Sequence, residues 1–190
     1  MLLYMIRHGE STANPMRRHA GWAQVPLTAK GEQDALVARE TLKGIEFDAV
    51  YSSDLVRALQ TKEIALPGIS FEITPLLREI NVGELAGKLP DEATAIYGEK
   101  YLADKARADF HDYGGENREE HEARMVAFLH LLEKSPVPRV AAFSHEGTMC
   151  RMLEFVQGMS TPVKRHCKNG GVCIFEHKEG AWHLVHWEDR

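Results

Sequence analysis

Leu2-Leu3-Tyr4-Met5-Ile6-Arg7-His8-Gly9-Glu10 is the stretch that decides the fold. Its apolar part is too short for a signal peptide or a membrane span, so it predicts a buried β-strand. A polar cluster that contains Arg7 and His8 follows where this strand ends. In open α/β sheets, ligands bind in the crevice outside the carboxyl ends of the strands. The candidate site is therefore expected at this junction.

After this strand, short apolar runs alternate along the chain with segments whose apolar residues follow a helical periodicity. Thr28 is expected to cap a helix that stops at Gly44, and Asp54 to cap a helix that runs towards Pro67. Glu116 is expected to open a further helix that ends before Pro136. The other predicted elements are strands at 47–51, 71–74 and 140–143, a helix around 149–156, and an edge hairpin of strands at 172–176 and 182–187. This alternation predicts a three-layer α/β/α sandwich with a mostly parallel central sheet.

A single domain over residues 1–190 is expected from the length of the chain. The composition changes between residues 80 and 116, where glycines and a proline separate short helical pieces. This segment is too short for a second domain. It predicts a lid-like insertion that folds over the site.

Composition excludes several classes of protein. The net charge of −5 argues against a nucleic-acid or anionic-membrane surface, and no apolar run approaches the length of a membrane span. Cys150, Cys167 and Cys173 are odd in number and lack Cys-x-x-Cys spacing, which predicts a reducing, cytoplasmic setting. The histidines form no metal-binding motif, so neither a metal nor a cofactor is expected. The oligomeric state stays open.

Four motifs combine into a more specific signal. They are Arg7–Asn14, Ser52–Thr61, Leu77–Glu79 and Phe143–Gly147. Together, and in this order, they resemble the histidine phosphatase superfamily, the phosphoglycerate-mutase-like enzymes, from residue 2 to about residue 155. The resemblance implies a phosphoglycerate-mutase-like fold and a phosphohistidine intermediate. It implies no metal.

Phosphoryl transfer needs a positive cage, an in-line nucleophile and a proton donor for the leaving oxygen. Arg7, Arg57 and His145 can form the cage. His8 can act as the nucleophile, because neighbouring arginines lower the pKa of its imidazole and keep it neutral. Glu79 can protonate the leaving group. The resemblance implies the same roles for these five residues.

Two further groups are candidates for the oxygen shell around the phosphate, and Arg57 has two possible roles. The Gly9 N–H and the Asn14 amide could complete the contacts to the phosphate. Arg57 is expected in the first turn of its helix, where a cation opposes the macrodipole unless an anion binds there. A surface salt bridge between Arg57 and Asp54 remains an alternative reading.

Glu146 departs from the family pattern, which commonly has glycine after the second histidine. A carboxylate beside a phosphate dianion costs energy unless it points away or pairs with a cation such as Arg7 or Arg57. The expected function is a metal-independent phosphomonoesterase of the small-phosphatase branch that acts on a small phosphorylated metabolite. The alternatives are a phosphoglycerate mutase and, motivated by Glu146, an inactive member that only binds phosphate. The mutase is disfavoured because the basic residues of the insertion are scattered, at Lys88, Lys100, Lys105 and Arg107.

Overall fold

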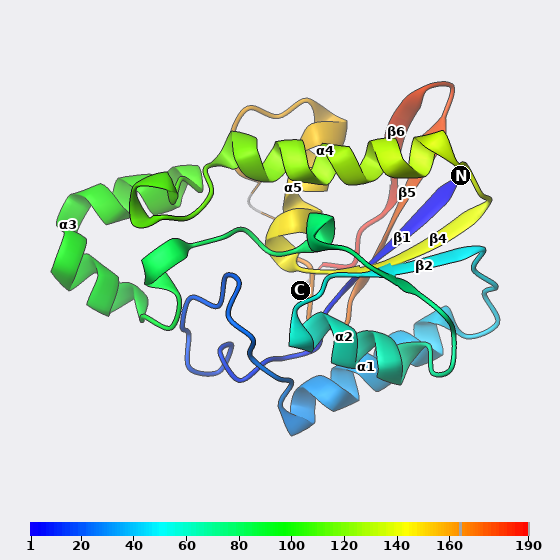
Figure 1. Cartoon of the computed structure of the whole chain (residues 1–190), viewed down its shortest axis with the longest axis horizontal. Helices are drawn as coiled ribbons and strands as arrows, with labels where there is room; N and C mark the ends of the chain where they lie inside the picture. Colours follow the sequence, from blue (N-terminus) through cyan, green and yellow to red (C-terminus); the bar gives the residue numbers. More distant parts are fainter. Residues whose placement is uncertain (164, 190) are drawn as a thin grey trace.

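The computed structural model describes residues 1–163 and 165–189 of the chain, and in these residues one sheet of six strands forms the centre (Figure 1). The sheet order is β3-β2-β4-β1-β5-β6. The strands are β1 Leu2–Arg7, β2 Ala49–Ser52, β3 Glu72–Ile73, β4 Arg139–Ser144, β5 Val172–Lys178 and β6 Ala181–His186.

The strand directions confirm the predicted, mostly parallel sheet. The strand that opens the chain, β1, runs parallel to β4, which runs parallel to β2, and β2 runs parallel to β3. The other neighbour of β1 is the antiparallel strand β5, which forms the predicted hairpin with β6 at the edge of the sheet. Parallel neighbours end at the same edge, so the polar residues that follow β1, β2 and β4 lie close together.

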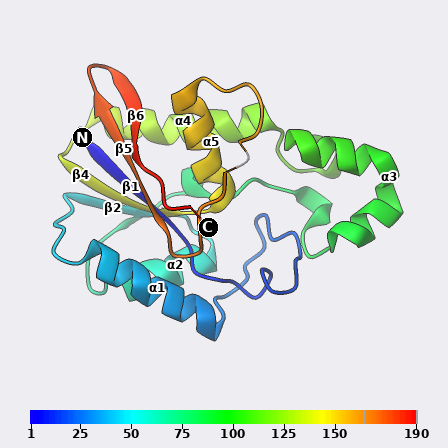
Figure 2. The ribbon, with the colours of Figure 1, turned by 180° about the vertical axis from the view of Figure 1, so that it is seen from behind.

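Helices cover both faces of the sheet and confirm the three-layer architecture (Figures 1 and 2). Helices α1 and α2 pack together on one face, and α4 and α5 on the other. The remaining helix, α3, lies away from the sheet (Figure 1). The helices are α1 Ala29–Leu42, α2 Val56–Ala65, α3 Pro90–Arg107, α4 Arg118–Lys134 and α5 Glu146–Gln157.

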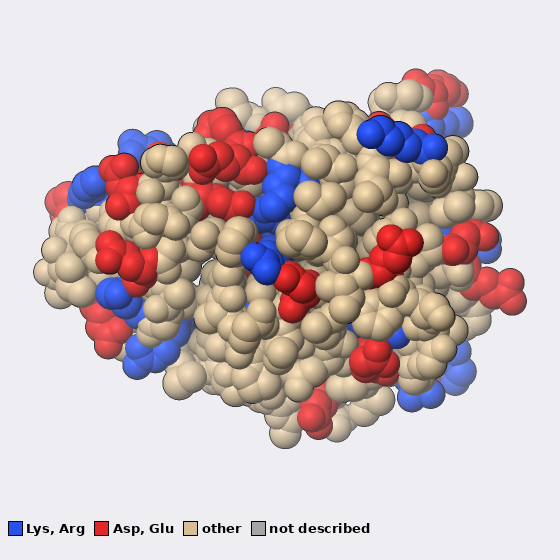
Figure 3. All heavy atoms as spheres, viewed as in Figure 1, with Lys and Arg blue, Asp and Glu red and all other residues tan. Residues whose placement is uncertain are grey.

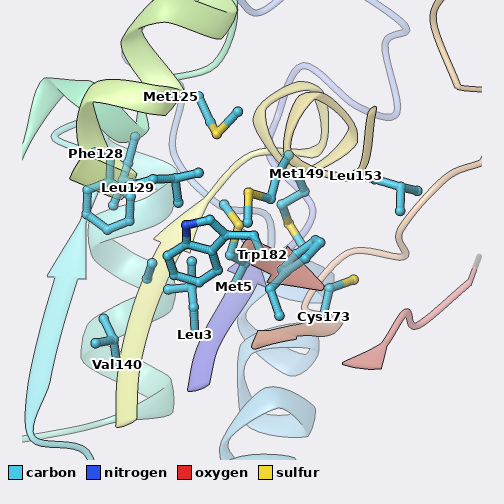
Figure 4. Packing of buried hydrophobic residues seen from close by; sticks show 14 of the residues in the cluster. Leu3, Met5, Met125, Phe128, Leu129, Val140, Met149, Leu153, Cys173 and Trp182 are labelled. Atoms are coloured by element: carbon cyan, nitrogen blue, oxygen red, sulfur yellow. The ribbon is translucent and has the colours of Figure 1, made fainter. Parts of the chain in front are cut away.

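Two apolar clusters hold these layers together. The larger one joins β1 to α4 and α5, with Leu3 and Met5 packed near Phe128 and Met149 (Figure 4). The smaller one lies on the opposite face, where Ile6 and Phe143 contact α1 and α2 residues such as Leu42. Because successive residues of a strand point to opposite faces, the apolar run of β1 supplies both clusters.

Two of the three predicted helix starts need correction. Thr28 does cap α1 and accepts a hydrogen bond from the Gly31 N–H at 3.0 Å. Asp54 does not cap α2, whose N-cap is Leu55, because the Asp54 carboxylate binds a distant arginine instead. The fourth helix starts at Arg118 and not at Glu116, and Asn117 is its cap.

The segment from 80 to 116 has an apolar cluster of its own. It contains α3 and two short 3-10 turns, Gly83–Leu85 and His111–Tyr113. Val82, Tyr101 and Phe110 are among the buried residues of its cluster. Its role as a lid remains a proposal, which the position of its residues beside the cavity supports.

The distribution of charged side chains on the surface agrees with the small negative net charge of the chain. On the face shown in Figure 3, basic and acidic side chains are interspersed. None of the helices in the described part of the chain combines the length and the apolar character that a membrane span requires.

Candidate active site

A cavity of about 310 Å³ opens where the parallel strands end. The main chain places His8 directly after β1 and His145 directly after β4, and the pairing of Arg7 with Ser144 brings the two histidines side by side. Their ring centroids are 5.1 Å apart. The residues that line the cavity are Arg7, His8, Ser11, Asn14, Arg18, His19, Ala20, Gly21, Arg57, Glu79, Ile80, Val82, Phe110 and Glu146.

His8 has the geometry of a neutral imidazole with a defined tautomer. Its Nδ1 lies 2.6 Å from the Gly9 carbonyl oxygen, which can only accept, so Nδ1 carries the proton. Its Nε2 accepts a hydrogen bond from Arg57 Nε at 3.2 Å. Burial, followed by the charges of Arg57 and Arg7, holds the pKa of His8 well below its usual range. His8 therefore presents an Nε2 lone pair at the cavity.

Arg57 is buried in the first turn of α2, as predicted. Its Nη atoms donate to the carbonyl oxygens of Gly21 at 2.9 Å and Ala23 at 3.0 Å. Burial lowers the pKa of Arg57 to about 10. The alternative salt bridge with Asp54 is wrong, because the Asp54 carboxylate takes two hydrogen bonds from Arg78, at 2.7 and 2.5 Å.

Arg7 ends β1 and is almost fully buried. One of its terminal nitrogens donates to the Cys167 carbonyl oxygen. The other lies 3.1 Å from a carboxylate oxygen of Glu146. Of the two arrangements open to Glu146, the structure shows the one in which the carboxylate pairs with a cation, and the partner is Arg7. The second oxygen of Glu146 lies 3.0 Å from His166 Nδ1.

Glu79 is fixed by the backbone on both of its oxygens. Its Oε1 accepts from the Ile80 N–H at 2.9 Å and its Oε2 from the Gly147 N–H at 3.1 Å. Glycine at position 147 allows this close approach, because a Cβ there would lie 2.1 Å from Glu79 Oε1 and would displace the carboxylate. The carboxylate thus shares the cavity with His8 while α5 controls its position.

His145 is fully buried beside His8 and is not one of the residues that line the cavity. Its Nε2 lies 2.9 Å from Ser53 Oγ, at the end of β2. Burial and the charge of Arg57 hold the pKa of His145 well below its usual range. Without a bound anion, both histidines are therefore neutral.

The two groups expected to complete the oxygen shell, the Asn14 amide and the Gly9 N–H, differ in whether they still have a hydrogen to donate. Asn14 lines the cavity, and its Oδ1 accepts from the Ser11 N–H at 2.7 Å, which leaves its amide NH₂ as a donor. The Gly9 N–H donates to Thr61 Oγ1 at 3.0 Å, so this donor already has a partner within the protein. Gly9 serves close packing instead, since a Cβ there would lie 2.1 Å from the Gly31 carbonyl oxygen.

Two residues that position the main chain at Glu79 have no recognisable signal of this role in the sequence. Trp22 Nε1 donates to the Glu79 carbonyl oxygen at 2.7 Å, and Arg124 Nη2 donates to the same oxygen at 3.1 Å. Arg124 also holds the Glu116 carboxylate. A lone tryptophan in a polar loop is a weak signal of such a role. Arg124 carries no local signal, because it is one charged residue of a helix whose exposed side is rich in charge.

The described residues contain no group of three or more His, Cys, Asp or Glu side chains placed to hold a metal ion. The chemistry of the cavity comes from arginine, imidazole and carboxylate groups. Metal independence itself remains a prediction.

Comparison with known proteins agrees with the geometry. The family model of the histidine phosphatase superfamily (branch 1) matches residues 3–190. A relative from Salmonella paratyphi A, named probable phosphoglycerate mutase GpmB, is 29% identical over 97% of this chain and 89% of its own. The α-ribazole phosphatase of Shigella flexneri has a TM-score of 0.87 and 26% identity, over 99% of this chain and 96% of that one.

A mycobacterial glucosyl-3-phosphoglycerate phosphatase, solved with VO3, shares the fold, with a TM-score of 0.88 and 24% identity over 98% of both chains. The family model covers nearly the whole sequence, and the four motifs meet at one cavity. The chain belongs to the histidine phosphatase superfamily, branch 1, which confirms both the family and the phosphatase class predicted from its motifs.

Proposed function

We propose that this protein is a metal-independent phosphomonoesterase that hydrolyses a small phosphorylated metabolite through a phosphohistidine at His8. The observation that carries the proposal is the neutral His8 ring, with Nδ1–H bound to the Gly9 carbonyl and Nε2 beside Arg57 in the cavity. A histidine nucleophile requires this protonation state.

In the first step, the Nε2 lone pair attacks phosphorus and the bond to the leaving oxygen breaks. Arg7 and Arg57 bind the non-bridging oxygens, and the N–H that Arg57 directs at Nε2 turns to the phosphoryl group. The added negative charge favours the protonated form of His145, whose charge acts on the phosphoryl group from its buried position beside His8. Glu79 donates its proton to the leaving alkoxide.

In the second step, Glu79 is a carboxylate and acts as the base. It removes a proton from a water molecule, which attacks phosphorus and breaks the N–P bond. Inorganic phosphate and neutral His8 result, and Glu79 is protonated again. One carboxyl group can serve both steps because its two backbone hydrogen bonds keep it in the cavity.

Hydrolysis rather than mutase activity is supported by the insertion. A mutase must hold its product while the phosphohistidine waits. Two of the insertion's four cations are paired with carboxylates of the insertion itself: Lys100 lies 2.6 Å from Asp104 and 2.8 Å from Asp112, and Arg107 lies 2.7 Å from Asp104. The relatives named phosphoglycerate mutase keep the mutase as the second candidate.

Turnover of p-nitrophenyl phosphate in the presence of a chelator tests the proposal. We expect activity in the wild type, an acid-labile phosphoenzyme after rapid quenching, and neither in His8→Ala. His130→Ala, at an exposed position of α4, is the matched control and should keep both. Faster interconversion of phosphoglycerates than phosphate release would establish the mutase. Tight vanadate binding without turnover would indicate the inactive member.

A further inference from the structure

We propose, on the basis of the proposed function, that Glu146 is a specificity-determining residue. It makes the enzyme prefer phosphate monoesters with an uncharged leaving group over esters that carry a carboxylate close to the phosphate. The position, the partners and the surroundings of this carboxylate each support the proposal.

Glu146 places a negative charge inside the cavity at a fixed point. It is the first residue of α5, lines the cavity with His8, and its side chain is 23% exposed. Its contacts with Arg7 and His166 hold it there, at 3.1 and 3.0 Å. Its charge is therefore balanced mainly by Arg7.

A bound phosphate removes this balance. Arg7 already gives one terminal nitrogen to the Cys167 carbonyl, and the phosphoryl group needs the side that faces the cavity. Once a dianion shares Arg7 with Glu146, the guanidinium no longer compensates both anions. A second negative charge on the substrate then meets a poorly compensated carboxylate.

The rest of the cavity offers little to attract a substrate carboxylate. Ile80, Val82 and Phe110 form an apolar wall. Arg18 lines the cavity, but it donates to the Gly87 carbonyl oxygen at 2.5 Å and pairs with Glu92 at 3.3 Å. These partners reduce the positive potential that Arg18 offers to a substrate.

The second basic group of this region is His19. Its Nε2 lies 2.6 Å from the Tyr101 hydroxyl. Burial, followed by the charge of Lys105, lowers the pKa of His19, so the ring is neutral near neutral pH. Among the described residues that line the cavity, both basic groups beyond the phosphate cage are therefore either paired or uncharged.

A matched pair of ligands isolates the effect of the carboxylate. Glycerol 3-phosphate has a CH₂OH group where 3-phosphoglycerate has a carboxylate, and the two esters are otherwise alike. The ratio of their inhibition constants against the initial rate of p-nitrophenyl phosphate turnover compares how strongly the two esters compete for the site; for an ester that is itself hydrolysed, the constant is its KM. We expect the wild type to bind the glycerol ester about tenfold more tightly, the effect of one poorly screened charge pair.

Glu146→Gln removes the charge and should bring the ratio close to one, mainly by tighter binding of 3-phosphoglycerate. Glu146→Asp keeps the charge and should keep a preference. Glu40→Gln, at an exposed site on α1, makes the same change in net charge and should leave the ratio unchanged.

Equal binding of the two esters by the wild type overturns the inference, as does an unchanged ratio in a folded Glu146→Gln protein. Equal binding by the wild type overturns the inference even if that variant does not fold. Absence of p-nitrophenyl phosphate turnover in the wild type contradicts the proposed function instead, so the two failures can be told apart.

Discussion

The Glu79 carboxylate illustrates how much of the candidate site depends on single hydrogen bonds. Both of its oxygens accept backbone N–H groups, at 2.9 and 3.1 Å, so its orientation is set before a substrate arrives. A pre-positioned carboxyl group can transfer a proton without losing side-chain entropy in the transition state.

Substitution of this residue gives a prediction about leaving groups. Glu79→Ala should lower kcat/KM for alkyl phosphates by about 10²- to 10⁴-fold, because an alkoxide needs protonation. The loss for p-nitrophenyl phosphate should be much smaller, since p-nitrophenolate is a good leaving group. The check is a plot of log kcat/KM against leaving-group pKa, which should be steeper in the variant. Equal losses across the series would remove Glu79 from the acid role.

The state of His8 could be predicted only in part. Its sequence neighbour Arg7 and the motif residue Arg57 predicted a lowered pKa. In the structure, the largest cause of the lowered pKa is burial. Burial depends on residues far away in the sequence, such as Asn169, whose side-chain amide donates to the His8 carbonyl oxygen at 3.1 Å. Residue types reveal charge, whereas burial follows from the assembled fold.

Helix α5 begins at the site, and its first two residues each make a contact with a site residue. Glu146 contacts Arg7, and the Gly147 N–H holds Glu79. Because of the close contact between position 147 and Glu79, a substitution at this position should affect the activity and the stability of the helix in opposite directions.

Gly147→Ala should stabilise the helix by up to about 1 kcal/mol in intrinsic propensity, yet displace Glu79, since the new Cβ would lie 2.1 Å from its Oε1. We expect a large loss of activity on alkyl phosphates. The double variant with Glu79→Ala relieves the clash and should be no less active than Glu79→Ala alone. Kinetics and thermal melts of all four proteins form the cycle, and additive losses would contradict the steric explanation.

Helix ends show where local sequence signals succeed and fail. Thr28 caps α1 because its hydroxyl oxygen accepts from the Gly31 N–H while its O–H donates to the Glu10 carboxylate. The two hydrogen bonds do not compete with each other. Asp54 had the right residue type for a cap, but Arg78 offers it two charge-assisted hydrogen bonds. Propensity therefore identified the helix, while a contact 24 positions away set the role of the carboxylate.

Across the whole molecule, the apolar runs and their alternation with helices were sufficient to predict the layers and the mostly parallel sheet. The order of the strands was not predictable in this way. The adjacency of β1 and β4, which brings His8 to His145, joins strands separated by more than a hundred residues. The cavity wall supplied by Arg18, His19 and Phe110 likewise depends on contacts between loops, which have no periodic pattern.

Three buried histidines make the stability of the whole fold sensitive to mild acid. Burial, with smaller contributions from nearby positive charges, holds the pKa values of His8, His121 and His145 well below their usual range. In the unfolded chain these groups titrate at about pH 6.5. Below that pH the unfolded state binds more protons than the folded state, so stability falls as the pH falls. The pKa values of Asp54 and Asp104 are lowered too, but their contribution is lost only near and below the usual carboxyl pKa.

The free energy of unfolding should therefore decrease between pH 7.5 and 5.5, with a limiting slope of about 4 kcal/mol per pH unit for three histidines. Urea titrations at several pH values measure it. His121→Gln, outside the cavity-lining set, can keep the hydrogen bond to Thr148 and should reduce the slope by about a third. His183→Gln, exposed on β6, should not change it. A flat profile would show that protonation of these histidines does not differ between the folded and unfolded states, and would count against the neutral His8 on which the proposed chemistry depends.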